Sequence, residues 1–264
     1  MADRDVAELL RAYDAQLRTH VPDRPPEGVR FEHDGPLLRT VGFVGRGWIE
    51  YRDLGGLDGE ELDELIARQV RYFGERGEPV EWKLHGHDLP ADLPKRLQAA
   101  GFVPEELETV VIARVAEVAG VVRPPEGVTL RDVCEREDLA RIAAMEKAVW
   151  GLDHHWLPDG LGNELAADPD GLAIVVAEAG DAVVCAAWVR FPSGTDFGTL
   201  WGGATLPEWR GRGIYRALVA HRAHLAAERG RRYLEVDASA DSRPILERLG
   251  FVPVTTTTPF VRSP

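Results

Sequence analysis

The residues best suited to binding chemistry are Arg-Gly-Arg-Gly-Ile-Tyr-Arg at 210–216, between a predicted strand and an amphipathic helix. A turn of this kind points successive backbone N–H groups outward at the positive end of a helix dipole, where phosphate groups bind. Gly211 and Gly213 let a ligand approach the backbone and tolerate positive φ angles. Three side chains add positive charge on the same side: Arg210, Arg212 and Arg216. The pattern predicts a pyrophosphate site; the alternative is a turn that only starts a surface helix.

The elements that position this turn follow from the spacing of apolar residues. The second half reads as strands, helices and one irregular polar and aromatic stretch, at 151–170. Strands are expected at 128–132, 172–178, 182–191, 197–206, 232–237 and 251–260, and helices at 137–150, 213–229 and 241–249. This order predicts an α/β (α+β) fold with a mixed, mostly antiparallel sheet flanked by helices.

The first half gives a similar but shorter pattern. Helices are expected at 6–17, 57–76 and 90–100, and strands at 28–32, 37–45, 47–53, 79–85 and 102–114. The segment 116–127 contains Arg-Pro-Pro-Glu-Gly, which resists both helix and sheet and predicts a linker. We therefore expect two domains, 1–120 and 121–264.

Two segments resemble each other across this boundary. Leu-Gln-Ala-Ala-Gly-Phe-Val-Pro at 97–104 parallels Leu-Glu-Arg-Leu-Gly-Phe-Val-Pro at 246–253, and both read as a helix that ends at glycine before a strand. The matching structural context favours two related units over a chance match.

Composition limits the possible functions. The chain has 264 residues, 44% of them hydrophobic, which is typical of globular proteins. A net charge of −13 argues against a nucleic-acid partner, because phosphate backbones need a basic surface. We see neither a membrane-spanning stretch nor a signal peptide, so we expect a cytoplasmic protein without a membrane partner. Cys134 and Cys185 lie far apart and form no metal-binding pattern, so we expect no metal.

Residues 127–261 resemble the GNAT superfamily of acyl-CoA N-acyltransferases. The family's turn has Gln or Arg, two residues, Gly, one residue, and then Gly or Ala. Arg210 and Gly213 match this pattern, whereas Tyr215 replaces the last small residue and would narrow the pyrophosphate groove. Leu-Gly-Phe at 249–251 follows at the right distance.

The resemblance implies that acetyl-CoA or another acyl-CoA is the co-substrate, and that two central strands splay apart to admit its pantetheine arm. The strand before the turn would bind that arm through its backbone and stabilise the oxyanion. The implied binding residues are Gly203, Ala204, Thr205, Arg210, Gly211, Arg212, Gly213, Ile214, Tyr215 and Arg216.

The first half is similar to the degenerate unit of tandem GNAT proteins. Its segment before the 57–76 helix is acidic and would repel a pyrophosphate. The acidic residues there are Asp53, Asp58, Glu60 and Glu61. We expect this half not to bind CoA, but to shape the acceptor cleft or support the fold.

The catalytic groups are less defined. Leu246 stands where many family members have a tyrosine that protonates the leaving thiolate. Ser239 could contact the thiol, although a helix cap is an alternative role for it. His154 and His155 are weak candidates for the base, although loop histidines without function are common. Glu146 is a weak catalytic candidate that would line the cleft from its helix, with a salt bridge as the alternative, and His221 is expected to be a packed structural histidine.

These observations predict an acetyl-CoA-dependent N-acetyltransferase that acylates a small-molecule or peptide amine. The acidic surface favours a cationic acceptor. The alternative function is a catalytically silent CoA-binding sensor or scaffold. The sequence defines neither the acceptor nor the oligomeric state.

Overall fold

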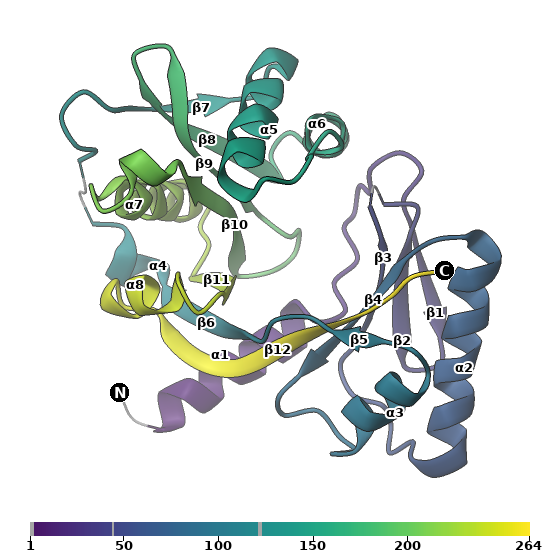
Figure 1. Cartoon of the computed structure of the whole chain (residues 1–264). Coiled ribbons are helices and arrows are strands. Elements are labelled where there is room, and N and C mark those ends of the chain that lie inside the picture. Colours follow the sequence, from purple (N-terminus) through teal and green to yellow (C-terminus); the bar gives the residue numbers. More distant parts are fainter. Residues whose placement is uncertain (1–2, 44, 121–122) are drawn as a thin grey trace.

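The computed structural model describes residues 3–43, 45–120 and 123–264. A 12-stranded sheet runs through both halves in the order β1-β2-β3-β4-β12-β6-β11-β10-β9-β8-β7, with β5 beside β12. The β3–β4 and β10–β11 pairs are parallel, and the other described pairs are antiparallel. Helices cover both faces, which confirms the predicted fold class (Figure 1).

Six of the described strands belong to the first half. The strands are β1 (Arg30–Asp34), β2 (Leu37–Val41), β3 (Gly47–Tyr51), β4 (Val80–His85), β5 (Val103–Pro104) and β6 (Glu108–Arg114). The helices are α1 (Asp3–Gln16), α2 (Gly59–Arg76), α3 (Leu93–Ala99) and α4 (Val115–Val118). The single strand predicted at 102–114 is therefore two strands. The predicted linker at 116–127 begins inside α4, and its residues 121–122 lie outside the described residues.

The second half follows the predicted order closely. Its strands are β7 (Thr129–Val133), β8 (Leu172–Ala179), β9 (Ala182–Arg190), β10 (Phe197–Thr205), β11 (Tyr233–Ala238) and β12 (Val252–Arg262). Its helices are α5 (Arg136–Trp150), α6 (Leu157–Ala167), α7 (Ile214–Glu228) and α8 (Arg243–Arg248), with a 3-10 turn, η1, at Pro207–Trp209.

The prediction that 151–170 is irregular was wrong, because α6 lies within it. Pro158 stands in the first turn of α6, where a missing N–H costs nothing. Leu157 and Leu161 are buried and Leu165 packs against the same core cluster, so a four-residue apolar spacing gives this helix its buried face. The helix is short and rich in glycine, which hides the period in the sequence.

The two halves exchange their last strands. β6, from the first half, pairs with β11 of the second half. β12, the last strand of the chain, pairs with β4 and β5 of the first half and also with β6. Phe260 of β12 belongs to the same core cluster as Trp82 of β4. The core of each half is thus completed by a strand of the other.

The two segments that resemble each other in sequence adopt the same local structure. After α3, Phe102 N donates to Leu97 O, and after α8, Phe251 N donates to Leu246 O. The intervening Gly101 and Gly250 have φ angles of 88° and 100°, which glycine adopts without strain. The resemblance is therefore structural, as expected for two related units.

The helices divide between the two faces of the sheet. One core cluster places α2 and α3 against β3 and β4, and another places α4, α7 and α8 against β6 and β11. On the opposite face, α1 packs over β6, β10 and β11, and α5 and α6 pack over β8 and β9. Figure 1 shows α1 crossing the middle of the molecule, where the two halves meet.

Candidate active site

The two central strands of the second half separate after a short paired stretch. β10 and β11 pair in parallel only from Phe197 to Thr199 and from Tyr233 to Glu235. The register of β10 against β9 then shifts between Gly202 and Ala204. Thr199 and Glu235 therefore stand at the vertex of a splay between the strands.

Two glycines shape β10 beyond this vertex. Gly202 and Gly203 have φ angles of 68° and 92°. A Cβ on Gly202 would lie 2.6 Å from the Trp188 ring, and one on Gly203 would lie 2.6 Å from the Tyr215 ring. Both positions therefore require glycine, since a side chain would meet an aromatic ring as well as backbone strain.

Arg222 of α7 holds this irregular part of β10 and was not identified from the sequence. Its side chain is 1% exposed. Nη1 donates to Trp188 O at 3.1 Å and to Trp201 O at 3.2 Å. Burial lowers the pKa of this guanidinium. The only sequence signal was a lone arginine among the apolar residues of a helix.

The splay opens into a continuous cleft of about 2070 Å³ that extends to both halves of the molecule. Every residue predicted to bind the acyl-CoA lines this cleft. These are Gly203, Ala204, Thr205, Arg210, Gly211, Arg212, Gly213, Ile214, Tyr215 and Arg216.

The glycine turn, residues 210–213, leaves the first amides of α7 available. Gly213 is the N-cap with a φ of 85°, and no side chain caps the helix or places negative charge in its first turn. A Cβ on Gly211 would meet nothing within 4 Å. Arg210 Nε donates to Thr205 O at 3.1 Å, and the Arg212 guanidinium lies 4.6 Å from the centre of the Trp209 ring. The turn thus fits a pyrophosphate, since open space, free amides and positive charge coincide.

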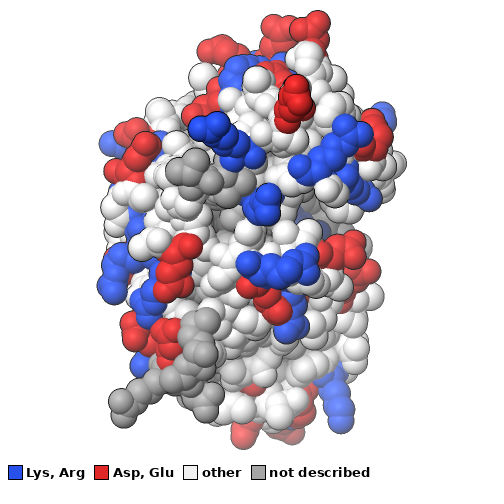
Figure 2. Space-filling model, turned by 90° about the vertical axis from the view of Figure 1, so that its left-hand side faces the viewer, with Lys and Arg blue, Asp and Glu red and all other residues white. Residues whose placement is uncertain are grey.

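The charge on this side of the molecule agrees with that interpretation. Figure 2 shows the face at the left of Figure 1, and its Lys and Arg side chains gather toward the middle of the face. Asp and Glu lie mostly nearer its edges and ends. An anionic ligand therefore meets local positive charge despite the net charge of −13.

Tyr215 lies against the strand rather than across the glycine turn. Its ring packs on Gly203 and against the core beneath α7. Burial raises the pKa of its hydroxyl, so the phenol stays neutral. The groove at 210–213 is therefore not filled by this tyrosine.

The catalytic candidates predicted from the sequence are dispersed. Ser239 lines the cleft, where its Oγ accepts a hydrogen bond from Ser242 N at 3.3 Å, as in a helix cap. His154, His155 and Glu146 do not line this cleft. Leu246 is fully buried, so no side chain at that position protonates a thiolate.

Glu146 and its neighbours form a separate contact on α5. Glu146 accepts a hydrogen bond from Trp150 Nε1 at 2.6 Å and lies 3.9 Å from His154 Nδ1. Burial raises the pKa of Glu146. His155 is 80% exposed beside Asp153.

The prediction that His221 packs in the core was wrong. Its side chain is 31% exposed, and Nε2 lies 2.8 Å from Asp132 Oδ1 of β7. The apolar side chains of α7 belong to two core clusters and therefore cover a wide arc of the helix. Its apolar spacing therefore did not distinguish the side on which His221 pairs with a surface carboxylate.

The sequence analysis missed a group of carboxylates on the cleft wall opposite α5 and α6. We call this group the acidic wall: Glu50 on β3, Glu81 on β4, Glu108 on β6, and Glu235 and Asp237 on β11, together with Lys83 on β4. All six side chains line the cleft. Four strands from both halves therefore build one polar surface.

Strand register explains why these side chains share a face. Trp82 packs in the core beneath α2, so its neighbours Glu81 and Lys83 point to the other face of β4. Leu234 and Ala238 pack beneath α7 and α8, so Glu235 and Asp237 likewise point away from them. The exchange of strands brings these two sets together.

One ion pair holds the wall together. Lys83 Nζ contacts Asp237 Oδ2 across the two halves. Although burial opposes it, Lys83 holds the pKa of Asp237 below its usual range. Burial, and then the neighbouring Asp237, raise the pKa of Glu235 well above the usual value.

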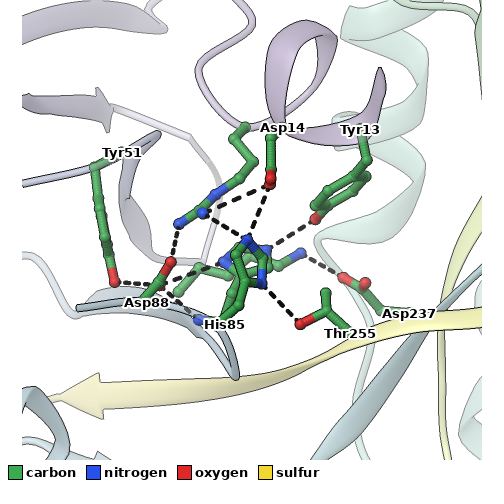
Figure 3. Close-up of polar contacts among 10 residues, drawn as sticks. Tyr13, Asp14, Tyr51, His85, Asp88, Asp237 and Thr255 are labelled. Atoms are coloured by element: carbon green, nitrogen blue, oxygen red, sulfur yellow. Dashed lines mark hydrogen bonds and ion pairs between the residues drawn. The ribbon is translucent and has the colours of Figure 1, made fainter. Parts of the chain in front are cut away.

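A polar network beside the wall fixes its position. Figure 3 shows Tyr13 of α1, His85 of β4, and Asp88 and Asp237 on either side of it. Tyr13 Oη lies 2.9 Å from His85 Nε2, and Asp88 accepts a hydrogen bond from Tyr51 Oη at 2.5 Å. Asp88 also pairs with Arg18 at 2.8 Å. The network ties the end of α1 to strands from both halves.

Two carboxyl groups of the acidic wall, those of Glu50 and Glu108, predict an unusual pH dependence of stability. Burial raises the pKa values of Glu50 and Glu108 to about 7. Lys83 lowers both pKa values, whereas Asp237 and Glu81 raise both. Arg18 also lowers the pKa of Glu50, and Glu105 raises that of Glu108. An unfolded glutamate has a pKa of about 4.3. The stability contributed by the protonated forms is therefore present below about pH 4.3 and lost as the pH rises through about 7.

We expect Glu108→Gln to stabilise the protein at pH 8 and to have little effect at pH 5, because glutamine resembles the protonated side chain. Allowing for solvent screening, the gain is about 1 kcal/mol, or about 2–4 °C in Tm. Thermal unfolding of both proteins at the two pH values measures it. A variant less stable than the wild type at pH 8 contradicts the prediction.

No group of His, Cys, Asp and Glu in the described part of the chain could hold a metal ion. None of the described helices is long and apolar enough to cross a membrane. Cys134 is exposed and Cys185 is buried, and both are free thiols.

Comparison with known proteins agrees with this geometry. A GCN5-related N-acetyltransferase from Kribbella flavida superimposes with a TM-score of 0.65 at 18% identity, over 100% of this chain and 96% of that chain. A tandem GNAT protein from the clavulanic acid biosynthesis pathway gives 0.64 at 15% identity, over 99% and 95%. A GCN5-related N-acetyltransferase from Sphaerobacter thermophilus gives a TM-score of 0.61 at 15% identity, over 97% of this chain and 85% of that chain. A search of the curated proteins finds no match.

At these identities the solved structures show the fold alone. The family comes from the sequence, since residues 137–251 match the model of the acetyltransferase (GNAT) family. That region contains the splayed strands, the glycine turn and α7. The chain therefore has the fold of tandem GNAT proteins, and its second half belongs to the acetyltransferase (GNAT) family.

Proposed function

We propose that this protein transfers the acetyl group of acetyl-CoA to an amine, with the glycine turn as the pyrophosphate site and the splay as the place of reaction. The observation that carries the proposal is the coincidence of free helix amides, open glycines and arginines at one end of a cleft that passes the splay. The family of the second half supports acyl transfer.

Each part of the site has a defined role in this proposal. The amides of the first turn of α7, with Arg210 and Arg212, bind the diphosphate. The backbone of 203–205 binds the pantetheine arm, because the splay leaves this part of β10 unpaired toward β11. Acetyl-CoA supplies a thioester, whose carbonyl oxygen gains negative charge as the amine adds and is stabilised by a backbone N–H of β10.

Glu235 is the proposed base. It stands at the vertex of the splay, and burial and then Asp237 raise its pKa above the usual value, which makes the carboxylate a stronger proton acceptor. Its carboxylate takes a proton from the acceptor nitrogen, which forms the C–N bond to the acetyl carbon as the C–S bond breaks. Water supplies the proton for the departing sulfur, since Leu246 cannot. The acceptor ammonium thus yields an acetamide, free CoA and one proton.

Replacing Arg210 and Arg212 together with glutamine should weaken CoA binding by at least tenfold, because each charge-assisted hydrogen bond contributes roughly 1.5–3 kcal/mol. Titration calorimetry with CoA measures the Kd. Arg71→Gln, an exposed position on α2, is the charge-matched control. Unchanged affinity in the double variant removes the glycine turn as the diphosphate site.

A catalytically silent CoA-binding sensor is the second candidate, favoured by the buried Leu246 in place of a tyrosine acid. Release of free thiol from acetyl-CoA in the presence of a panel of amines separates the two functions. CoA binding without thiol release, for any amine or peptide, favours the sensor.

A further inference from the structure

The acidic wall has more carboxyl groups than the surrounding cations pair with. Among the described residues, Lys83 pairs with Asp237, Arg18 pairs with Asp88, and Arg46 lies 3.4 Å from Glu81. Arg46 also lies 3.3 Å from Glu105 at the edge of the cleft.

Three carboxylates of the wall remain without a salt bridge in the described part of the chain: Glu50, Glu108 and Glu235. Glu235 is only 6% exposed and still lines the cleft. The Oδ1 atom of Asp237 is buried without a hydrogen-bond partner. Burying such groups unpaired costs free energy, which a bound cation offsets.

These carboxyl groups lie in two places along the cleft, so they can contact two different parts of one ligand. Glu235 stands at the splay, where the proposed reaction takes place. Glu108 lies on the neighbouring strand β6, four residues from Ile112, the partner of Glu235, which is about 13 Å along the strand. Both side chains point into the same cleft, and the charge of Glu108 still raises the pKa of Glu235. Glu50 lies further into the first half, on β3. A cation bound beside Glu108 therefore lies several bonds of an extended chain from the reacting nitrogen, and Glu50 lines the same cleft beyond it.

We propose that the acceptor is an amine with a second positive charge, which Glu50 and Glu108 of the first half bind while the nitrogen to be acetylated lies at Glu235. This inference rests on the proposed acetyltransferase function. The first half thus selects the acceptor, and the second half binds the acyl donor.

A matched series of acceptors tests the charge requirement directly. Butylamine, 1,4-diaminobutane and 4-aminobutanoate all have a four-carbon backbone and differ in the charge of the group remote from the amine. We expect kcat/KM for 1,4-diaminobutane to exceed that for butylamine by at least tenfold, since charged hydrogen bonds are strong. The anionic 4-aminobutanoate should be the poorest acceptor. Spermidine extends the series to a longer cation.

Two variants locate the effect. In the Glu50→Gln, Glu108→Gln double variant, the preference for 1,4-diaminobutane over butylamine should fall by about tenfold, because the remote charge loses both partners. Glu64→Gln, on the exposed side of α2, is the matched control and should keep the preference. Circular dichroism and CoA affinity verify that each variant is folded.

Calorimetric titration of the protein with 1,4-diaminobutane and with spermidine gives a readout that needs no acetyl transfer. Binding that disappears in the double variant supports the inference even if the sensor function is correct. Equal kcat/KM values for butylamine and the diamine, or an unchanged preference in the double variant, overturn it. The inference is also overturned if neither 1,4-diaminobutane nor spermidine binds or is acetylated while the protein still binds CoA.

Discussion

Replacing Glu235 with glutamine should lower kcat for amine acetylation at pH 7 by roughly a hundredfold or more, the usual contribution of a positioned base. The amide has the same shape but accepts no proton. Among the described residues, the other carboxylate beside Glu235 on β11 is Asp237, which pairs with Lys83 and stays ionised. Steady-state thiol release with saturating acetyl-CoA measures kcat.

Three further measurements separate a base from a structural role. CoA affinity should stay unchanged, since Glu235 lies away from the glycine turn. The fall in rate on the acidic side of the wild-type pH profile should be absent from the variant, because the titrating group is gone. Glu64→Gln should leave kcat as in the wild type. A Glu235→Gln enzyme that keeps half of the wild-type kcat would falsify the assignment.

Replacing Phe260 with alanine should destabilise the whole protein by about 3–5 kcal/mol, or about 10 °C in Tm. Phe260 is 3% exposed in the core of the first half, although it stands in the last strand of the chain. Because β12 also pairs with β6, whose other neighbour is β11, loss of this contact should affect both halves together. Urea unfolding followed by circular dichroism and tryptophan fluorescence measures the effect.

The neighbouring Val261→Ala is the control, since Val261 is only partly buried, and we expect it to cost at most about 1 kcal/mol. Both probes should report one transition in the wild type and in Phe260→Ala. Two separate transitions, with CoA binding retained after the first, contradict mutual support between the halves.

Local patterns predicted most of the fold and the donor side of the site. The glycine turn was readable because its function depends on consecutive residues: Gly211 and Gly213 provide the conformation, and α7 provides the amides. The matching glycine ends of α3 and α8 were readable for the same reason. The helix α6 was missed because it is short and rich in glycine, so few apolar residues show its period.

The acidic wall was not predictable in this way. Its carboxylates come from four strands that are distant in sequence, and the exchange of β6 and β12 decides which of them face one another. In the sequence, Glu50 and Glu108 lie in two different predicted strands, 47–53 and 102–114, with nothing to link them. Arg222 is similar, since its role depends on two carbonyl groups of β9 and β10. Non-local pairing therefore limits what the sequence alone shows about the acceptor side.

The crossing of β6 and β12 also constrains how such a protein can change over generations. Neither half can be deleted or replaced as a cassette, because each would take away a central strand from the remaining one. Descendants of this gene must therefore retain the half that lacks a glycine turn. Because β3, β4 and β6 carry part of the acidic wall, we expect new acceptor specificities to arise by substitution on these strands rather than by recombination.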